Sequence, residues 1–333
     1  MVPRRGLEPP RVLPHRILSP ARLPVPPPGR RKSDVPCFFV LFQVQKSQSL
    51  CLNHKHFMSK ELSEKELQRL KDIARDIRVL IIKMLVQAGS GHPGGSLSAA
   101  DIVTALYFHK MHHDPKDPNR DRFILSKGHA VPVLYAAFVK TGYLEEAEVM
   151  TLRKINSRIQ GHPDHVRLPL LETSAGSLGV GLSIAQGMAL AAKMDNKKFK
   201  TYCMLGDGEI QEGQIWEAAM SASKFQLDNL IGILDYNGAQ IDGPVKDVMD
   251  IEPIADKWRA FNWHVMTIDG HNMSEIIMAL NEADYIKGKP IMIIANTVKG
   301  KGVSFMENVI DWHGKAPSAE EGKKAIEEIL SGS

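Results

Sequence analysis

The chain has 333 residues, of which 43% are apolar, 24% charged and 6% aromatic, as in an ordinary globular protein. No apolar run approaches the roughly 20 residues that a membrane-spanning helix needs, so we expect no membrane association. Three cysteines, Cys37, Cys51 and Cys203, are too few for a disulfide framework and lack the spacing of a zinc site. We therefore expect a protein of a reducing compartment, the cytoplasm.

The net charge of +4 is unevenly distributed along the chain. Residues 1–57 carry seven Arg and three Lys against one Glu and one Asp, a net charge of +8, which leaves −4 for the remainder. Ten of the 20 prolines lie between Pro3 and Pro36, where they deny the backbone donors for helix or sheet. We expect residues 1–57 to be a disordered extension or translated upstream DNA, with Met58 as the native start. Nucleic-acid binding by the mildly acidic remainder is not expected.

From Met58 onward the pattern predicts one folded domain, residues 58–333. Ser63 and Glu66 have capping-box spacing at the start of a long amphipathic helix. Apolar strands then alternate with helices: strands are predicted at 122–125, 201–205, 229–235, 264–268 and 290–297, and helices at 178–194, 214–223 and 274–286. This alternation predicts an α/β fold with a doubly wound, mostly parallel sheet and helices on both faces.

Polar residues follow two of the predicted strands. Gly206-Asp207-Gly208 comes directly after the strand that ends at Leu205, and Asn237 follows the next strand. One helix between these strands brings both ends to the same edge of the sheet, where ligands bind in such folds. A carboxylate, an amide oxygen and a backbone carbonyl suit Mg²⁺, and the glycines allow backbone N–H groups to approach a diphosphate.

The span from Gly206 to Gly243 resembles the thiamine diphosphate fingerprint of transketolases, which opens with GDG and closes with Asn about 30 residues later. The resemblance implies thiamine diphosphate as the cofactor and Mg²⁺, for which Ca²⁺ or Mn²⁺ can substitute, as the metal. By this resemblance, Asp207, Asn237 and the main-chain carbonyl of Ala239 bind the metal. Gly208 and Asn237 contact the cofactor, and Ile241 packs near its thiazolium ring. Glu212 links paired active sites.

Four histidine loops also resemble the transketolase pattern and occur in the expected order along the chain. They are the loops around His92, His129, His162 and His313. Histidines can hydrogen-bond to phosphates and sugar hydroxyls and can move protons, all of which ketol transfer requires. The resemblance implies that His129 and His313 approach the diphosphate and substrate, and that His92 and His162 line the substrate channel.

Two further segments match the same family. The stretch 175–181 resembles a glycine-rich turn in which Gly176, Ser177 and Leu178 contact the cofactor's diphosphate and aminopyrimidine. Lys299 matches a lysine that animal-type transketolases place near the diphosphate. Gly94-Gly95 replaces polar residues that some relatives have at that position.

The resemblance extends from Met58 to Leu330, about the first half of a full transketolase. It implies the N-terminal subunit of a split transketolase, which moves a two-carbon ketol unit from a ketose phosphate to an aldose phosphate, as in the pentose phosphate pathway. A separate C-terminal subunit would supply the glutamate that activates the cofactor, in a heterotetramer with two subunits of each kind.

Three alternatives stay open at this point. The alpha subunit of a 2-oxo-acid dehydrogenase shares the cofactor motif, although the histidine loops argue against it. An enzyme like 1-deoxyxylulose-phosphate synthase shares several of these loops but is usually a single long chain. A regulatory module that binds the cofactor without activity belongs to another class, and an isolated subunit would behave like one. A ketol-transfer assay with pyruvate or xylulose 5-phosphate as the donor would distinguish the first two alternatives from a transketolase.

Overall fold

The computed structural model describes residues 62–332, so the expected extension at residues 1–57 lies outside the described residues. In this part of the chain five strands form one sheet in the order β1-β2-β3-β7-β6, and all neighbouring strands are parallel. The strands are β1 (Arg122–Leu125), β2 (Thr201–Gly206), β3 (Leu230–Tyr236), β6 (His264–Asp269) and β7 (Ile291–Asn296). Each lies within one residue of the predicted bounds, and the expected α/β fold is confirmed.

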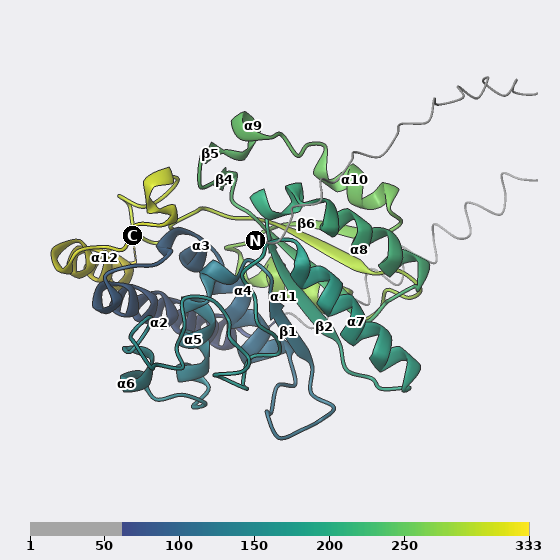
Figure 1. Ribbon diagram of the computed structural model, residues 1–333, viewed down its shortest axis with the longest axis horizontal. Coiled ribbons are helices and arrows are strands. Elements are labelled where there is room, and N and C mark those ends of the chain that lie inside the picture. The colour runs from purple at the N-terminus through teal and green to yellow at the C-terminus, as the bar shows by residue number, and fades with distance from the viewer. Residues whose placement is uncertain (1–61, 333) are drawn as a thin grey trace, which may run out of the picture. The chain divides into compact units, whose positions relative to one another are not determined.

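Helices cover both faces of the sheet (Figure 1). One face packs against α7 (Val180–Met194), α8 (Gly213–Lys224) and α10 (Ile254–Ala260). The other face packs against α2 (Glu64–Ala88), α4 (Ala100–Ala105), α5 (Pro132–Lys140), α11 (Met273–Glu282) and α12 (Ala319–Ser331). Shorter elements are α3 (Pro93–Ser98), α6 (Glu146–Val149), α9 (Val245–Val248) and a small antiparallel pair, β4 (Ala239–Gln240) and β5 (Gly243–Pro244). None of the helices among residues 62–332 is long and apolar enough to cross a membrane.

The strands are apolar on both faces because both faces are covered. In β2, Tyr202 and Met204 belong to the core under α2, while Cys203 and Leu205 belong to the core under α7 and α8. Successive side chains of a strand point to opposite faces, so one continuous apolar run supplies both cores.

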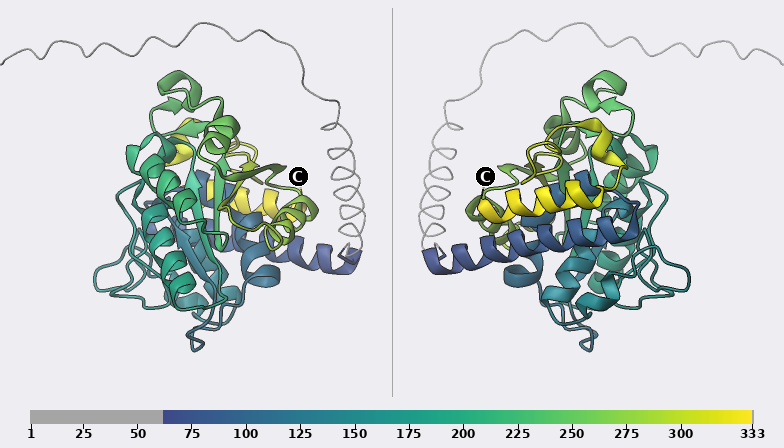
Figure 2. Two further views of the ribbon diagram at one scale, coloured as in Figure 1. Left: turned by 90° about the vertical axis from the view of Figure 1, so that its right-hand side faces the viewer. Right: turned by 90° about the vertical axis from the view of Figure 1, so that its left-hand side faces the viewer.

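The first and the last helix of the described chain lie side by side on one face. Helix α12 runs alongside α2 (Figure 2), and Gly322 permits the close approach, since a Cβ there would lie 2.3 Å from Val86 Cγ2. The capping box predicted for α2 is only half formed: Ser63 Oγ accepts from the Glu66 N–H at 3.2 Å, but the Glu66 carboxylate pairs with Arg69 instead. The same motif is complete at Ser318 in α12.

The strand order places a switch point between β3 and β7. From β3 the chain leads to α10, which packs on one face of the sheet, and from β7 it leads to α12, which packs on the other. Connections leave the two neighbouring strands toward opposite faces, which opens a crevice at their carboxyl ends. Asn237, a predicted site residue, directly follows β3, and Thr297 directly follows β7, so both lie at this crevice.

Candidate active site

The four predicted histidines come together at the carboxyl edge of the sheet. His92 directly precedes α3, His129 lies in a 3₁₀ turn after β1, His162 lies in the loop between α6 and α7, and His313 ends a 3₁₀ turn before α12. The ring of His92 is central: its centroid lies 5.2 Å from that of His129, 5.7 Å from that of His313 and 6.3 Å from that of His162. The rings of His129 and His313 are stacked at 5.2 Å.

The surroundings of these rings favour the neutral imidazole. Burial, reinforced by Arg153, lowers the pKa of His92 to about 4, and burial with Lys299 lowers the pKa of His313 to about 3. Burial next to Lys127 holds the pKa of His129 well below its ordinary value, and burial also lowers the pKa of His162. A neutral ring has one donor and one acceptor nitrogen, so the cluster can both give hydrogen bonds to oxygen and take up protons from it.

Lys299 supplies a buried cation beside these rings. Its Nζ donates to the Ala239 carbonyl at 2.9 Å and lies 2.8 Å from His313 Nδ1. Burial, helped by the charge of Lys127, lowers the pKa of Lys299 to about 8. Gly94 makes room for this side chain, because a Cβ there would lie 2.9 Å from Lys299 Cγ. Gly94 is therefore a packing requirement of this chain, whereas a Cβ at Gly95 would lie 3.5 Å from His129 Nε2, an ordinary contact.

Asp207 provides a buried carboxylate without a salt bridge to any residue of the described part. Its Oδ1 accepts from the Gly208 N–H at 2.8 Å and its Oδ2 from the Gly238 N–H at 2.5 Å. Burial and the nearby Asp235 charge raise the pKa of Asp207 to about 6. A bound cation would relieve this unfavourable burial of negative charge.

The other two expected metal ligands, Asn237 and Ala239, lie in the turn after β3, where the Gly238 N–H between them donates to Asp207. Asn237 Oδ1 accepts from the Ala239 N–H at 3.2 Å, and the Ala239 carbonyl faces Lys299. Residues 62–332 contain no group of three or more His, Cys, Asp or Glu side chains placed to hold a metal. One carboxylate, one amide oxygen and one carbonyl instead fit a hard cation that takes its remaining oxygens from phosphate and water.

A buried hub that the sequence analysis did not single out supports Asn237. Asp235 is ion-paired with Lys127, accepts from Ser98 Oγ at 2.7 Å and from Thr297 Oγ1, and accepts from Asn237 Nδ2 at 3.2 Å. Burial alone would raise the pKa of Asp235, but Lys127 and these hydrogen bonds outweigh burial and hold it below its ordinary value. The available signal was a charged residue at the end of an otherwise apolar strand, which needs a partner.

A second buried carboxylate, Glu209, supports the glycine-rich turn and was also missed. It accepts from Ser126 Oγ and from the Gly179 and Gly206 N–H groups, each at 3.0 Å. The loops after β1 and β2 and the start of α7 are thereby tied to one side chain. Its position in the GDGE run was the only signal in the sequence.

The remaining predicted contact residues lie at the surface of this chain. Gly176 and Ser177 are exposed and Leu178 is half-buried. Glu212 is exposed at the start of α8, and 63% of Ile241 is accessible. The neighbouring Ala175 N–H donates to the Pro163 carbonyl at 3.0 Å, which brings the glycine-rich turn next to the His162 loop. The structure thus gathers these residues at one edge, and their contacts with a cofactor stay predictions.

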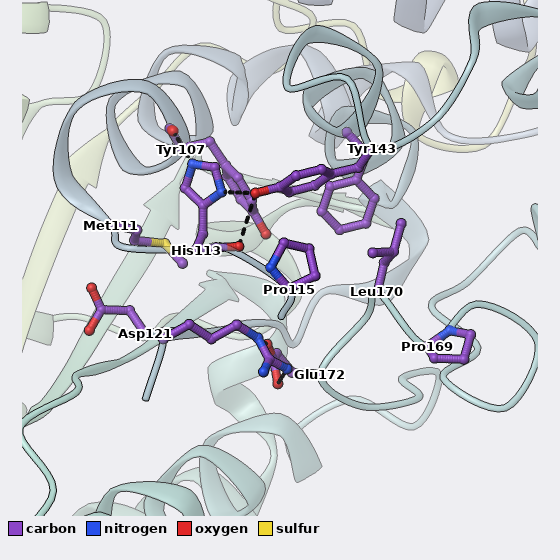
Figure 3. Close-up of a pocket in the computed structure, with 11 residues that line it drawn as sticks. Tyr107, Met111, His113, Pro115, Asp121, Tyr143, Pro169, Leu170 and Glu172 are labelled. Carbon is purple, nitrogen blue, oxygen red and sulfur yellow. Dashed lines mark hydrogen bonds and ion pairs between the residues drawn. The ribbon is translucent and has the colours of Figure 1, made fainter. Parts of the chain in front are cut away.

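The two described cavities lie outside the histidine cluster. One, of about 40 Å³, lies near the amino end of β1, where His113 is held between Tyr143 Oη at 2.7 Å and the Tyr107 carbonyl at 2.6 Å (Figure 3). It has room for only a few water molecules. A larger, open one of about 300 Å³ is lined by Tyr236 and Asn296 on the opposite face of the sheet from Asp235. The candidate site is therefore defined by side-chain chemistry at the sheet edge.

Comparison with known proteins shows which family this chain resembles. The family model for the transketolase, thiamine diphosphate binding domain, matches residues 70–330. The apulose-4-phosphate transketolase subunit from Phocaeicola vulgatus is 42% identical, with 79% of this chain and 93% of that protein covered. The 6-deoxy-6-sulfo-D-fructose transketolase subunit SqwG of a Clostridium species is 45% identical, with 80% of this chain and 98% of that protein covered.

Single-chain transketolases are similar over part of their length only. The human transketolase is 43% identical over 80% of this chain but 43% of that protein. The crystal structure of the Campylobacter jejuni transketolase superposes with a TM-score of 0.74 at 36% identity, with 79% of this chain and 43% of that chain covered. The chain therefore spans less than half the length of these transketolases, and nearly the full length of the two relatives named as subunits.

Proposed function

The chain belongs to the transketolase enzymes, through their thiamine diphosphate binding domain, and we propose that it is the N-terminal subunit of a split, Mg²⁺-dependent transketolase. It would transfer a two-carbon ketol unit from a ketose phosphate to an aldose phosphate. The observation that supports this proposal best is the set of four neutral histidines beside Lys299 and Asp207 at the carboxyl edge of the sheet.

We assign the residues as follows. Asp207, Asn237 and the Ala239 carbonyl would hold Mg²⁺, and the turn at Gly176–Leu178, Gly208 and Lys299 would bind the cofactor's diphosphate. Bound thiamine diphosphate supplies the carbanion chemistry of ketol transfer. His129 and His313 would donate hydrogen bonds to phosphate oxygens, while His92 and His162 would orient the sugar hydroxyls and exchange protons with them.

We propose a separate C-terminal subunit as the partner. Two relatives covered almost completely by this chain are named as subunits, which supports a division of the enzyme between two chains. The partner would supply the glutamate that activates the cofactor, and Glu212, exposed directly before α8, would lie between paired sites in a heterotetramer.

The substrate pair and the cellular setting belong to the same proposal. The names of the two subunit relatives specify a sugar phosphate in one case and a sulfosugar in the other, so relatives of this kind are not restricted to one pathway. We propose a sugar phosphate substrate, with central pentose phosphate metabolism in the cytoplasm as the first setting to test.

The deciding experiment is copurification of this chain, started at Met58, with the product of the adjacent gene, followed by a ketol-transfer assay. The assay contains Mg²⁺, thiamine diphosphate and either xylulose 5-phosphate or pyruvate as the donor. Transfer from xylulose 5-phosphate by the complex alone is the expected result. Transfer by this chain alone would contradict the division of the site, and a preference for pyruvate would contradict the transketolase reaction.

A further inference from the structure

The loop after β6 brings His271 against the loop after β7. The backbone N–H of His271 donates to Asp269 Oδ1 at 2.8 Å, which closes an Asx turn, and the Gly270 N–H donates to the Asn296 carbonyl at 2.8 Å. Gly270 permits this approach, since a Cβ there would lie 2.4 Å from Thr297 Cγ2. The run Asp269-Gly270-His271 therefore holds the histidine next to the residues that follow β7.

Both ring nitrogens of His271 have a partner. Nδ1 lies 2.7 Å from Asp101 Oδ2, and Nε2 lies 2.8 Å from the backbone nitrogen of Val298. An ionised carboxylate only accepts hydrogen bonds and a backbone N–H only donates them, so Nδ1 carries the proton and Nε2 accepts. The two partners thus fix the ring in one tautomer, and 13% of this side chain is exposed.

Arg78 holds Asp101 in turn. Its Nη1 donates to Asp101 Oδ1 at 3.1 Å and its Nη2 to Oδ2 at 2.5 Å, and both side chains are buried. Burial alone would raise the pKa of Asp101, but Arg78 and His271 outweigh burial and lower it to about 2. A polar triad of Arg78 from α2, Asp101 from α4 and His271 therefore ends on one backbone N–H, that of Val298.

Val298 directly precedes Lys299, the buried cation of the candidate site. The Val298 N–H donates to His271, and the Gly300 N–H donates to the Gly94 carbonyl at 3.0 Å. One hydrogen bond thus fixes the backbone on each side of Lys299. Of these two bonds, the one to His271 has a side chain as its acceptor, so a substitution can remove it.

We propose that His271 is a positioning residue, which sets the place of Lys299 by holding the Val298 N–H. Lys299 Nζ contacts the Ala239 carbonyl at 2.9 Å and His313 Nδ1 at 2.8 Å, so a small shift of its backbone breaks both contacts. A side chain that binds a ligand keeps its geometry where surrounding hydrogen bonds lock it. The inference rests on the proposed function, which assigns Lys299 to the cofactor's diphosphate.

Two variants of His271 separate its two hydrogen bonds. In His271→Asn the amide lies near the position of Nδ1 and can donate to Asp101, but the Val298 N–H is left without an acceptor. In His271→Gln the longer side chain reaches the position of Nε2, so its oxygen can accept from Val298 while the bond to Asp101 is lost. Each variant keeps one bond, and Arg78 stays paired with Asp101 in both. We therefore expect both to fold, with similar melting temperatures.

The first readout is the affinity of thiamine diphosphate with Mg²⁺ for the complex of this chain with its C-terminal subunit, measured by calorimetry. His271→Asn should weaken this affinity about tenfold, and His271→Gln less than about threefold. The matched control is His264→Asn, at the other end of β6, where the half-buried ring pairs with Glu282; it should leave the affinity unchanged.

A double-mutant cycle shows whether His271 acts through Lys299. When the chain also carries Lys299→Met, His271→Asn should cause no further loss of affinity, because the residue through which it acts is gone. A further loss as large as in the chain with Lys299 intact would overturn the inference. Equal losses in His271→Asn and His271→Gln, or full affinity in His271→Asn, would also overturn it.

A second readout decides the inference without the proposed function. It is the rate at which the Lys299 amine of the full chain, without ligands, reacts with acetic anhydride, followed by peptide mass spectrometry. Loss of the Val298 bond should speed this reaction several-fold in His271→Asn but not in His271→Gln or His264→Asn. The same rate in His271→Asn and the unchanged chain would overturn the inference. If the unchanged complex binds no thiamine diphosphate and transfers no ketol unit, only the proposed function fails.

Discussion

Lys127 and Asp235 form an ion pair that is closed to solvent at the carboxyl end of β3, with 2% and 0% of their surfaces exposed. The pair connects several elements, because Lys127 Nζ also donates to the Gly95 carbonyl at 2.7 Å and Asp235 also accepts from Thr297. Asn237, an expected metal ligand, donates to the same carboxylate. The pair therefore sets the positions of loops that follow β1, β3 and β7.

Removal of one partner should destabilise the fold strongly. Lys127→Met leaves the Asp235 carboxylate buried without its cation, which typically costs about 3–5 kcal/mol in the free energy of unfolding. Urea unfolding of the chain measures this loss. Lys140→Met, which breaks the exposed pair with Asp76, should cost less than about 1 kcal/mol and is the matched control. A loss of similar size in both variants would contradict the structural role of the buried pair.

The sheet could be predicted from the sequence because it obeys one simple rule. Strands covered on both faces are apolar throughout, as β2 and β7 are, and are separated by helices of the right length. Helix ends were harder to predict, since neighbouring groups compete for hydrogen bonds to the same side chain. Glu66 can serve either Ser63 or Arg69, and the sequence does not show which partner is closer.

The site was predictable where a motif has a local role. The four histidines follow recognisable loops, and the structure brings their rings together. Glu209 was missed because its role depends on neighbours far along the chain. It meets Ser126 and Gly179 only after the sheet has formed.

Asp207→Asn should abolish Mg²⁺-dependent binding of thiamine diphosphate, with an affinity loss of a hundredfold or more, because the amide removes the only carboxylate from the donor set. Burial and Asp235 raise the pKa of Asp207 to about 6, so removal of this charge should offset part of the cost of leaving the Gly208 or Gly238 N–H without its acceptor. Calorimetry with Mg²⁺ and cofactor measures the affinity. Asp242→Asn, at the exposed turn between β4 and β5, is the control. Unchanged affinity in Asp207→Asn would refute the metal assignment.

Acid should destabilise the chain through its buried histidines. The pKa of His92 is lowered from 6.5 to about 4 and that of His313 to about 3, so between pH 6.5 and 4 the unfolded chain takes up protons that the folded chain does not. The contribution of these rings is complete above pH 6.5 and is lost as the pH falls, by less than about 1.4 kcal/mol per pH unit for each ring, because both rings stay in partial contact with solvent, which weakens the shift. Urea unfolding across this range measures the slope.

In the variant His92→Gln, the slope of the unfolding free energy against pH between pH 6.5 and 4 should fall by the contribution of one titrating group. The slope between pH 7 and 8 should not change. An identical acid slope in the variant and the unchanged chain would show that His92 takes up its proton equally well in the folded state.

Gly94 and Gly187 should respond oppositely to replacement by alanine. A Cβ at Gly94 would lie 2.9 Å from Lys299 Cγ and 3.1 Å from the Trp312 carbonyl oxygen, so the lysine must move away from the proposed diphosphate site. We expect Gly94→Ala to destabilise the fold by about 1–3 kcal/mol and to weaken thiamine diphosphate binding about tenfold. Gly187 lies inside α7 with no atom within 4 Å of a Cβ, so Gly187→Ala should stabilise the fold by about 0.5–1 kcal/mol. Gly187→Ala leaves the site untouched and is the control. A loss of cofactor affinity in Gly94→Ala alone would tie that affinity to the position of Lys299. Full cofactor affinity in Gly94→Ala would remove Lys299 from the proposed diphosphate contacts.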